Sequence, residues 1–147
     1  MKAKEIYEIM ARKLERPVIH CISLMYEGAV HERLENVNLR ELVKEQSCKS
    51  GLWKTYSAGI VISDSKEVGV FASKHLYDQE SSESEHIIFI ALREPVTLVK
   101  RSKGAWRERV YRNQTLQYES VPFEKTVKIN APVNPELVEE IIKMLRP

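Results

Sequence analysis

The chain has 147 residues, of which 23 are Lys or Arg and 21 are Asp or Glu, so its formal net charge is +2. A chain of this length suits one domain, 1–147, and buries about 68–70% of the surface that it would expose when unfolded. Because 43% of the residues are hydrophobic and 30% are charged, the composition is that of a globular protein and excludes a globally disordered or low-complexity chain.

The N-terminus indicates a cytoplasmic protein. Residues 1–5 lead directly into an amphipathic pattern, without the apolar region of about 7–15 residues that a secretory signal contains. The longest apolar-rich stretch, 87–92, is far shorter than the roughly 20 residues that a transmembrane helix needs. Cys21 and Cys48 are then expected to be reduced thiols, and no membrane span is predicted.

Residues 1–50 are predicted to form a helical N-terminal part. Apolar residues recur at helical spacing at Ile6, Ile9, Met10 and Leu14. This pattern predicts a helix over 2–15. The pattern over 18–35 is compatible with a strand or a helix, and we favour a helix. A further helix is predicted over 38–48, because Asn38 is a good N-cap with a glutamate three residues later.

From Trp53 the hydrophobic period changes to two, which predicts an antiparallel β-sheet over 53–130. The predicted strands are 56–63, 67–74, 86–92, 96–101, 105–112, 115–121 and 125–130. Asp64-Ser65-Lys66 is a hairpin turn signal, and the acidic segment 77–85 is expected to be an exposed loop. The continuous apolar run 86–92 is typical of a strand that is buried on both faces.

The C-terminal segment 134–146 has clear helix signals. Asn134 is a good N-cap, and Pro135 suits the first helical position. The apolar side chains of this helix are Leu137, Val138, Ile141, Ile142 and Leu145. They cover more than one face, so we expect the helix to pack on the sheet or against a second copy of the chain.

The predicted fold class is therefore α+β, with N-terminal helices, a six- to seven-stranded, mostly antiparallel, meander-like sheet, and a short C-terminal helix packed on that sheet. Strand–turn–strand spacing this short leaves no room for the crossover helices of a Rossmann-type sheet. In layout alone the outline resembles pleckstrin-homology-like domains on the one hand and roadblock- or profilin-like domains on the other.

Common catalytic and ligand-binding motifs are not found. The five glycines are too scattered to form a phosphate-binding loop. The His and Cys residues have no metal-ligand spacing. Ser63 and Lys66 match an SxxK pattern, but they lie in a predicted turn instead of at a helix N-terminus. We therefore predict no catalytic residue, metal or cofactor, and an enzyme with an unidentified site stays a third hypothesis.

The unusual feature is a basic segment at 100–112. It contains six basic residues, Lys100, Arg101, Lys103, Arg107, Arg109 and Arg112. Its one acidic residue is Glu108, so its net charge is +5 while the other 134 residues sum to −3. On a strand, Arg107, Arg109 and Tyr111 would share one face. Arginine suits phosphate because its planar fork donates two parallel hydrogen bonds and keeps its charge.

The sequence thus favours a non-enzymatic binding or regulatory domain whose basic hairpin, 100–112, contacts an anionic partner, either nucleic acid or an acidic protein. The candidate contacts are Lys100, Arg101, Lys103, Arg107, Arg109, Tyr111 and Arg112. Alternatively, the charges only keep an edge strand soluble, or they pair with the acidic segment 78–85 within the chain or across a dimer. A second hypothesis is a homodimeric adaptor. Its interface would be an edge strand and the helix side chains Leu137, Val138, Ile141, Ile142 and Leu145.

Overall fold

Two helices flank eight antiparallel strands in the computed structural model, which describes residues 2–24 and 30–147. The helices are α1 (Lys2–Leu14) and α2 (Pro135–Leu145). The strands are β1 (Ile19–Leu24), β2 (Val30–Leu34), β3 (Asn38–Lys49), β4 (Leu52–Ser63), β5 (Lys66–Asp78), β6 (Glu83–Leu92), β7 (Leu98–Arg112) and β8 (Thr115–Ile129). The α+β class is confirmed, with eight strands instead of six or seven. Neither described helix is long and apolar enough to cross a membrane.

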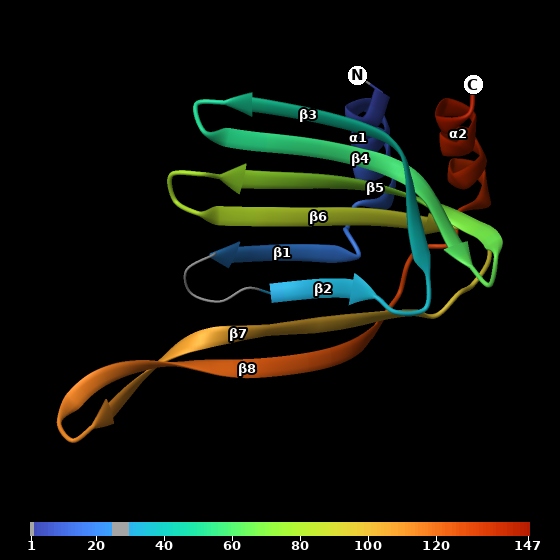
Figure 1. Cartoon of the computed structure of the whole chain (residues 1–147). Helices are drawn as coiled ribbons and strands as arrows, with labels where there is room; N and C mark the ends of the chain where they lie inside the picture. Colours follow the sequence, from blue (N-terminus) through green and yellow to red (C-terminus); the bar gives the residue numbers. More distant parts are fainter. Residues whose placement is uncertain (1, 25–29) are drawn as a thin grey trace.

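The strands form two sheets instead of one meander. The larger sheet has the order β1-β6-β5-β4-β3, so β3 to β6 follow one another as a meander and β1 joins beside β6. The smaller sheet has the order β2-β7-β8. Both helices lie on one side of the larger sheet, and β7 and β8 extend away from the rest of the molecule (Figure 1).

Three of the hairpins have two-residue turns in which both residues have positive φ. These turns are Ser50-Gly51, Asp64-Ser65 and Asn113-Gln114. Two positive φ angles give the turn a twist that matches the right-handed twist of the flanking strands. The predicted turn after Ser63 is confirmed. Because it is a tight hairpin turn, Ser63 and Lys66 do not form the helical SxxK arrangement.

The predicted helix over 38–48 is wrong, because this segment is β3 and pairs with β4 along its length. The ladder shifts register between Glu41 and Val43, which leaves Leu42 as an extra residue. Such a bulge disrupts the two-residue alternation of a strand. Leu39 and Val43, four residues apart, therefore imitate one face of a helix, although they pack on opposite faces of the sheet.

The helix favoured over 18–35 is also wrong in its described parts, where 19–24 is β1 and 30–34 is β2; residues 25–29 lie outside the described residues. Within the described residues of 1–50, α1 is therefore the one helix. The acidic segment 77–85 is mostly strand, because β5 runs to Asp78 and β6 begins at Glu83.

The predicted strands at 96–101 and 105–112 are one continuous strand, β7, and those at 115–121 and 125–130 are likewise one strand, β8. Segment 100–112 is thus not a hairpin by itself, because its turn is Asn113-Gln114. β8 continues through Pro122 because it is an edge strand, where a proline nitrogen can face solvent without the loss of a ladder hydrogen bond.

The larger sheet is packed with apolar side chains on both faces. One face contacts α1 and α2, including Ile6, Met10 and Ile141. The other face packs against Leu98 and Leu34 of the smaller sheet. The strand predicted to be buried on both faces is buried from Ile88 to Leu92.

The C-terminal helix begins as predicted, and the Leu137 backbone N–H donates to Asn134 Oδ1 at 3.1 Å. The candidate interface residues Leu137, Val138, Ile141 and Leu145 are buried in this chain, and Ile142 packs against the same cluster. The sheet of the same chain therefore already covers the apolar face that the adaptor hypothesis assigned to a partner.

Candidate functional site

Among residues 2–24 and 30–147, no third strand lies beside the end of the β7–β8 hairpin. β2 pairs with β7 only from Lys100 to Gly104, so residues 105–122, which we call the arm, form a two-stranded ribbon (Figure 1). Asn36 anchors the base of the hairpin, where the Val99 backbone N–H donates to Asn36 Oδ1 at 2.9 Å. A two-stranded ribbon alone is marginally stable in water, so the arm depends on this base.

Strand alternation sorts the charged side chains of the smaller sheet onto two faces. The face turned away from the larger sheet, which we call the basic face, carries the cations Arg33, Arg101, Lys103, Arg107, Arg109 and Lys128. Its two acidic residues are Glu124 and Glu35, and Glu35 directly follows β2. Six cations against two carboxylates give this face a net charge of +4.

The opposite face, which we call the inner face, is neutral. Its cations are Lys100, Arg112 and Lys125, and its carboxylates are Glu32, Glu108 and Glu119. Toward the base this face also carries Leu34 and Leu98, which pack in the core. The positive charge that the sequence shows in one segment is therefore concentrated on one face of one sheet.

Two exposed tyrosines lie at the outer end of the basic face. Tyr111 is 68% exposed and Tyr118 is 55% exposed. The Arg107 guanidinium lies 5.5 Å from the centroid of the Tyr118 ring, which is within the range of a cation–π contact. We call the described residues outside the arm the body. On the inner face, Trp106 stacks on Phe123 with ring centroids 5.1 Å apart and stiffens the arm where it leaves the body.

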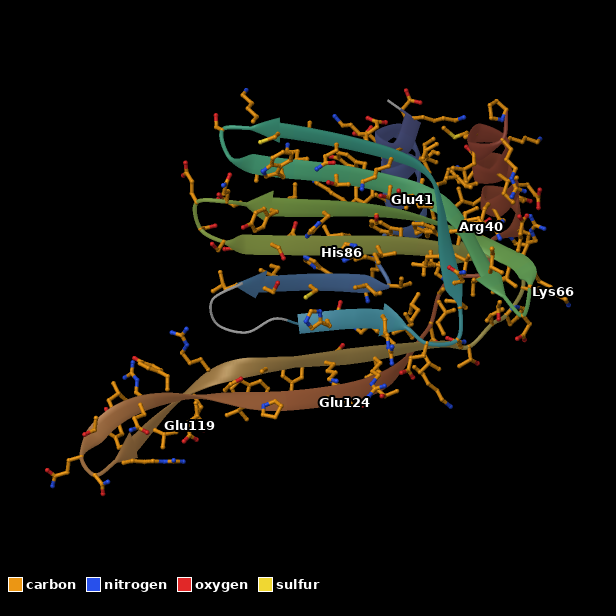
Figure 2. The ribbon with its side chains drawn as sticks, in the orientation of Figure 1. Arg40, Glu41, Lys66, His86, Glu119 and Glu124 are labelled. Atoms are coloured by element: carbon orange, nitrogen blue, oxygen red, sulfur yellow. The ribbon has the colours of Figure 1, made fainter. Side chains whose placement is uncertain are left out.

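Five of the seven predicted contact residues lie together on the basic face: Arg101, Lys103, Arg107, Arg109 and Tyr111. Lys100 and Arg112 lie on the inner face. Lys100 Nζ is 3.2 Å from Glu32 Oε1 at a site where both side chains are mostly buried, and Arg112 pairs with Glu119. Figure 2 shows Glu119 on the outer part of the hairpin and Glu124 nearer its base.

Four further residues of the basic face were missed by sequence reasoning: His31, Arg33, Tyr118 and Lys128. His31 and Arg33 were missed because 18–35 was assigned to a helix. The alternation of Val30, Glu32 and Leu34 with these two residues was the available signal for a strand. Tyr118 required the register of β8, which the two-residue turn at 113–114 could have supplied.

A polar cluster lies between the two sheets. Glu32 Oε1 accepts from Lys100 Nζ at 3.2 Å and from Ser102 Oγ at 3.4 Å. Cys21 and His86 are cross-strand neighbours on the facing sheet. Burial, and then the charge of Glu32, raise the pKa of the Cys21 thiol, while burial, and then His75, lower the pKa of His86. Both shifts favour the neutral forms, which is the opposite of a thiolate–imidazolium catalytic pair.

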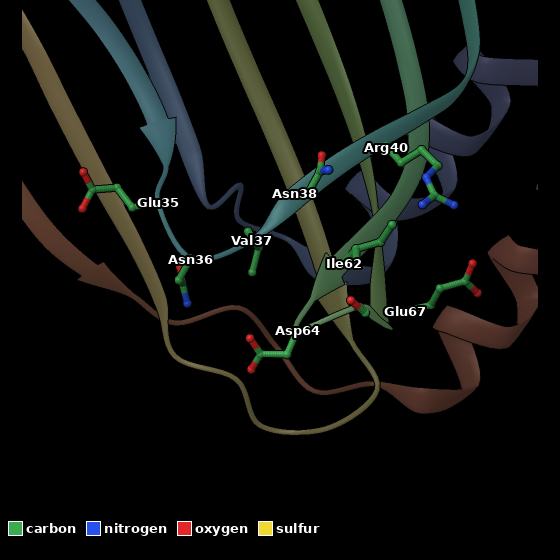
Figure 3. A pocket seen from close by; sticks show the side chains of 9 residues that line it. Glu35, Asn36, Val37, Asn38, Arg40, Ile62, Asp64 and Glu67 are labelled. Atoms are coloured by element: carbon green, nitrogen blue, oxygen red, sulfur yellow. The ribbon is translucent and has the colours of Figure 1, made fainter.

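A cavity of about 590 Å³ lies beside the β4–β5 turn and contains the carboxylates Glu35, Asp64 and Glu67. Glu35 and Glu67 lie at opposite sides of it (Figure 3). Arg146 binds Glu67 through two hydrogen bonds of 3.0 and 2.5 Å and lowers the pKa of that carboxyl group. Arg33 and Arg101 contact Glu35. Glu35 and Glu67 are thus engaged in separate ion pairs and do not form an acid–base pair with each other.

Comparison with family models, with curated proteins and with solved structures finds no match for this chain. Over residues 2–24 and 30–147, no group of three or more His, Cys, Asp and Glu side chains is arranged to hold a metal ion. The basic face is the feature that argues most directly for a function.

Proposed function

We propose that this protein is a non-enzymatic, cytoplasmic domain that binds nucleic acid on its basic face. The observation that supports the proposal is the separation of charge on the smaller sheet, with six cations and two carboxylates on one face and a neutral balance on the other. Charges that served only to keep an edge strand soluble would not need to be separated into one positively charged face and one neutral face.

The dimensions of the basic face suit a phosphate backbone. Alternate residues on a strand are about 6.8 Å apart, so Arg101 and Arg109 are separated by about 27 Å along β7. Nucleotides spaced at about 3.4 Å give a strand of roughly eight nucleotides the same length. A two-stranded ribbon twists strongly, so the row of cations winds around the hairpin instead of lying in one plane.

The exposed tyrosines favour nucleic acid over an acidic protein. Tyr111 and Tyr118 present ring surface next to Arg107 and Arg109 on the basic face. Aromatic side chains interleaved with cations are the features that bind single strands, because bases stack on the rings while the backbone follows the charges. We therefore expect single-stranded DNA or RNA to bind more tightly than a duplex.

The test is fluorescence anisotropy with labelled single-stranded and duplex oligonucleotides, repeated at about 50 and 200 mM salt. Saturable binding that weakens steeply with salt is expected. Arg107→Ala with Arg109→Ala should weaken binding about tenfold or more and should reduce the slope of log affinity against log salt by about 1.4, since two phosphate contacts are lost.

The matched control is Arg12→Ala with Lys13→Ala, which removes the same charge from the exposed end of α1. This control should bind nearly as tightly as the wild type. Equal weakening in both double variants would show a general charge effect, and the absence of binding at low salt would remove the proposal.

A further inference from the structure

A pocket lies on the smaller sheet where the arm leaves the body. It has a volume of about 490 Å³ and is lined by His31, Glu32, Arg33, Arg101 and Lys103. Except for Glu32, these residues belong to the basic face. The pocket therefore forms the body end of the row of cations that runs along β7 to the arm.

The register of β2 on β7 places like residues opposite each other at this pocket. Arg33 is directly opposite Arg101, and His31 is directly opposite Lys103. Like charges in such cross-strand pairs destabilise a sheet. The Arg33–Arg101 pair therefore brings hydrogen-bond donors together at a cost to strand pairing, beside His31 and Lys103, and a bound anion would replace that repulsion with attraction.

The partners present in the chain satisfy this cluster only in part. Glu35 Oε1 lies 3.4 Å from both Arg33 Nη2 and Arg101 Nη1, and Glu124 pairs with Arg101 Nη2. Arg101 Nε is buried and has no hydrogen-bond partner among the described residues. A contact of 3.4 Å is long for a charge-assisted hydrogen bond, so Arg33 can turn toward a ligand oxygen, while Glu124 holds Arg101 Nη2.

We propose that this pocket binds the terminal phosphate of a nucleic-acid strand, an inference that rests on the proposed function. A phosphomonoester carries a charge of about −1.5 to −2 at pH 7 and has three acceptor oxygens, whereas an internal phosphodiester carries a single charge. The three cations Arg33, Arg101 and Lys103 suit the monoester better, while Glu32, which also lines the pocket, accepts hydrogen bonds from Lys100 and Ser102. On the β2 side, the row of cations ends at Glu35. The carboxylate of Glu35 would repel the phosphate backbone of a nucleic-acid strand that continued past the pocket.

This placement gives the bound strand a direction. Its phosphorylated end lies at Arg33 and Arg101, its internal phosphates lie along Arg107 and Arg109, and its bases reach Tyr118 and Tyr111 at the tip. A 5′-phosphate and a 3′-phosphate present the same chemistry to the pocket, so the experiment must compare both.

The experiment uses three single-stranded oligonucleotides of one sequence and about 12 nucleotides, a length that covers the basic face. They carry an internal label and end in a 5′-phosphate, a 3′-phosphate or hydroxyl groups only. For the full chain we expect at least one phosphorylated form to bind about tenfold more tightly than the hydroxyl form. Tighter binding of both phosphorylated forms also supports the phosphomonoester pocket.

Arg33→Ala and Arg109→Ala form a matched pair of variants, each of which removes one exposed arginine from the basic face. Arg33→Ala should reduce the preference for a phosphorylated end to less than about twofold, because it removes a bidentate donor from the pocket. Arg109→Ala should weaken all three oligonucleotides by a similar factor and keep the preference.

The outcomes separate this inference from the proposed function. Equal, saturable binding of all three oligonucleotides would overturn the terminal-phosphate pocket and leave the nucleic-acid interface standing. A preference that survives Arg33→Ala, or one that Arg109→Ala abolishes, would also overturn the pocket. If none of the three oligonucleotides binds at low salt, the proposed function itself fails, and this inference fails with it.

Discussion

The body and the arm of this molecule follow different rules for where residue types are placed. In the larger sheet and its two helices, apolar residues form a buried core on both faces of the sheet, although Ile22, Leu24, Leu42, Leu52 and Trp53 are exposed. In the arm, the large residues Trp106, Tyr111, Leu116 and Tyr118 are exposed, and the residue type follows the face of the ribbon. Packing thus accounts for the body, whereas the arm needs an explanation from what it contacts.

The two regions also differ in what stabilises them. In the arm, the contacts are side-chain pairs such as Trp106 with Phe123, Arg107 with Tyr118, and Arg112 with Glu119. Cross-strand pairs of this kind contribute about 0.2–1 kcal/mol each, far less than a continuous apolar core. We therefore expect the arm to open locally at a lower free energy than the body, which opens only with global unfolding.

The largest effect is expected from a charge placed in the body. Ile141 is fully buried between α2 and the sheet, so Ile141→Asp removes its apolar contacts and adds an unpaired charge. We expect a loss of about 4 kcal/mol or more in the free energy of unfolding, measured by urea unfolding with circular dichroism. Tyr111→Asp on the arm should change it by less than about 0.5 kcal/mol.

A different result for Ile141→Asp would revive the adaptor hypothesis. If the variant stayed as stable as the wild type and changed only the oligomeric state, the helix would be an interface between copies. Its apolar residues would then be explained by a partner and not by packing within the body.

A smaller, pH-dependent effect on stability is expected at His86, which lies on β6 (Figure 2) between its cross-strand neighbours Cys21 and His75. Burial first, and His75 second, lower the pKa of His86 in the folded protein. In the unfolded chain, His86 has its ordinary pKa of about 6.5 and therefore binds a proton more readily than in the folded protein. The contribution of His86 to the free energy of unfolding is therefore fully present above about pH 6.5. It decreases as the pH falls below that value toward the lower pKa of His86 in the folded protein.

His86→Gln should flatten this decrease when the free energy of unfolding is measured between about pH 7.5 and 5.5. His75→Gln should flatten it less, because His75 is the second cause of the shift after burial. An unchanged pH profile in His86→Gln would mean that another group dominates the acid destabilisation.

A smaller effect on stability than that of Ile141→Asp is expected when the arm is removed. Gly104 and Phe123 are opposite each other in the β7–β8 ladder, so an Asn-Gly turn can join them in place of residues 105–122. We expect the free energy of unfolding to change by no more than about 1 kcal/mol, because no core residue is lost. The same variant should bind nucleic acid much more weakly, because Arg107, Arg109 and both exposed tyrosines of the basic face are removed. Failure of the shortened chain to fold would show that the arm takes part in the folding of the body.

Sequence patterns within a few residues predicted those elements that are determined by interactions between near neighbours in the chain. Asn134 and Pro135 marked the start of α2, and the apolar spacing marked α1. β3 was mistaken for a helix because the extra residue at Leu42 breaks the strand alternation. β8 was divided at Pro122 because the sequence does not reveal that this strand lies at an edge.

The candidate site was predicted in part for the same reason. The basic segment and the shared face of Arg107, Arg109 and Tyr111 follow from alternation alone. The contribution of Arg33 depends on its pairing with Arg101, and a contact between residues so far apart in the chain has no local signature. The same pairing of β2 with β7 places Glu32 beside Lys100, which alternation along β7 already puts on the inner face.

The proline in β8 has a consequence for how crowded copies of the protein behave. β8 is an edge strand of 15 residues, long enough to act as a template for a strand from another molecule, which is how ordered aggregates grow. At Pro122 the edge has no N–H donor, so the row of donors that such a template needs is interrupted within the strand. The molecule can therefore extend a long, thin ribbon into solvent with a built-in barrier to polymerisation along its edge.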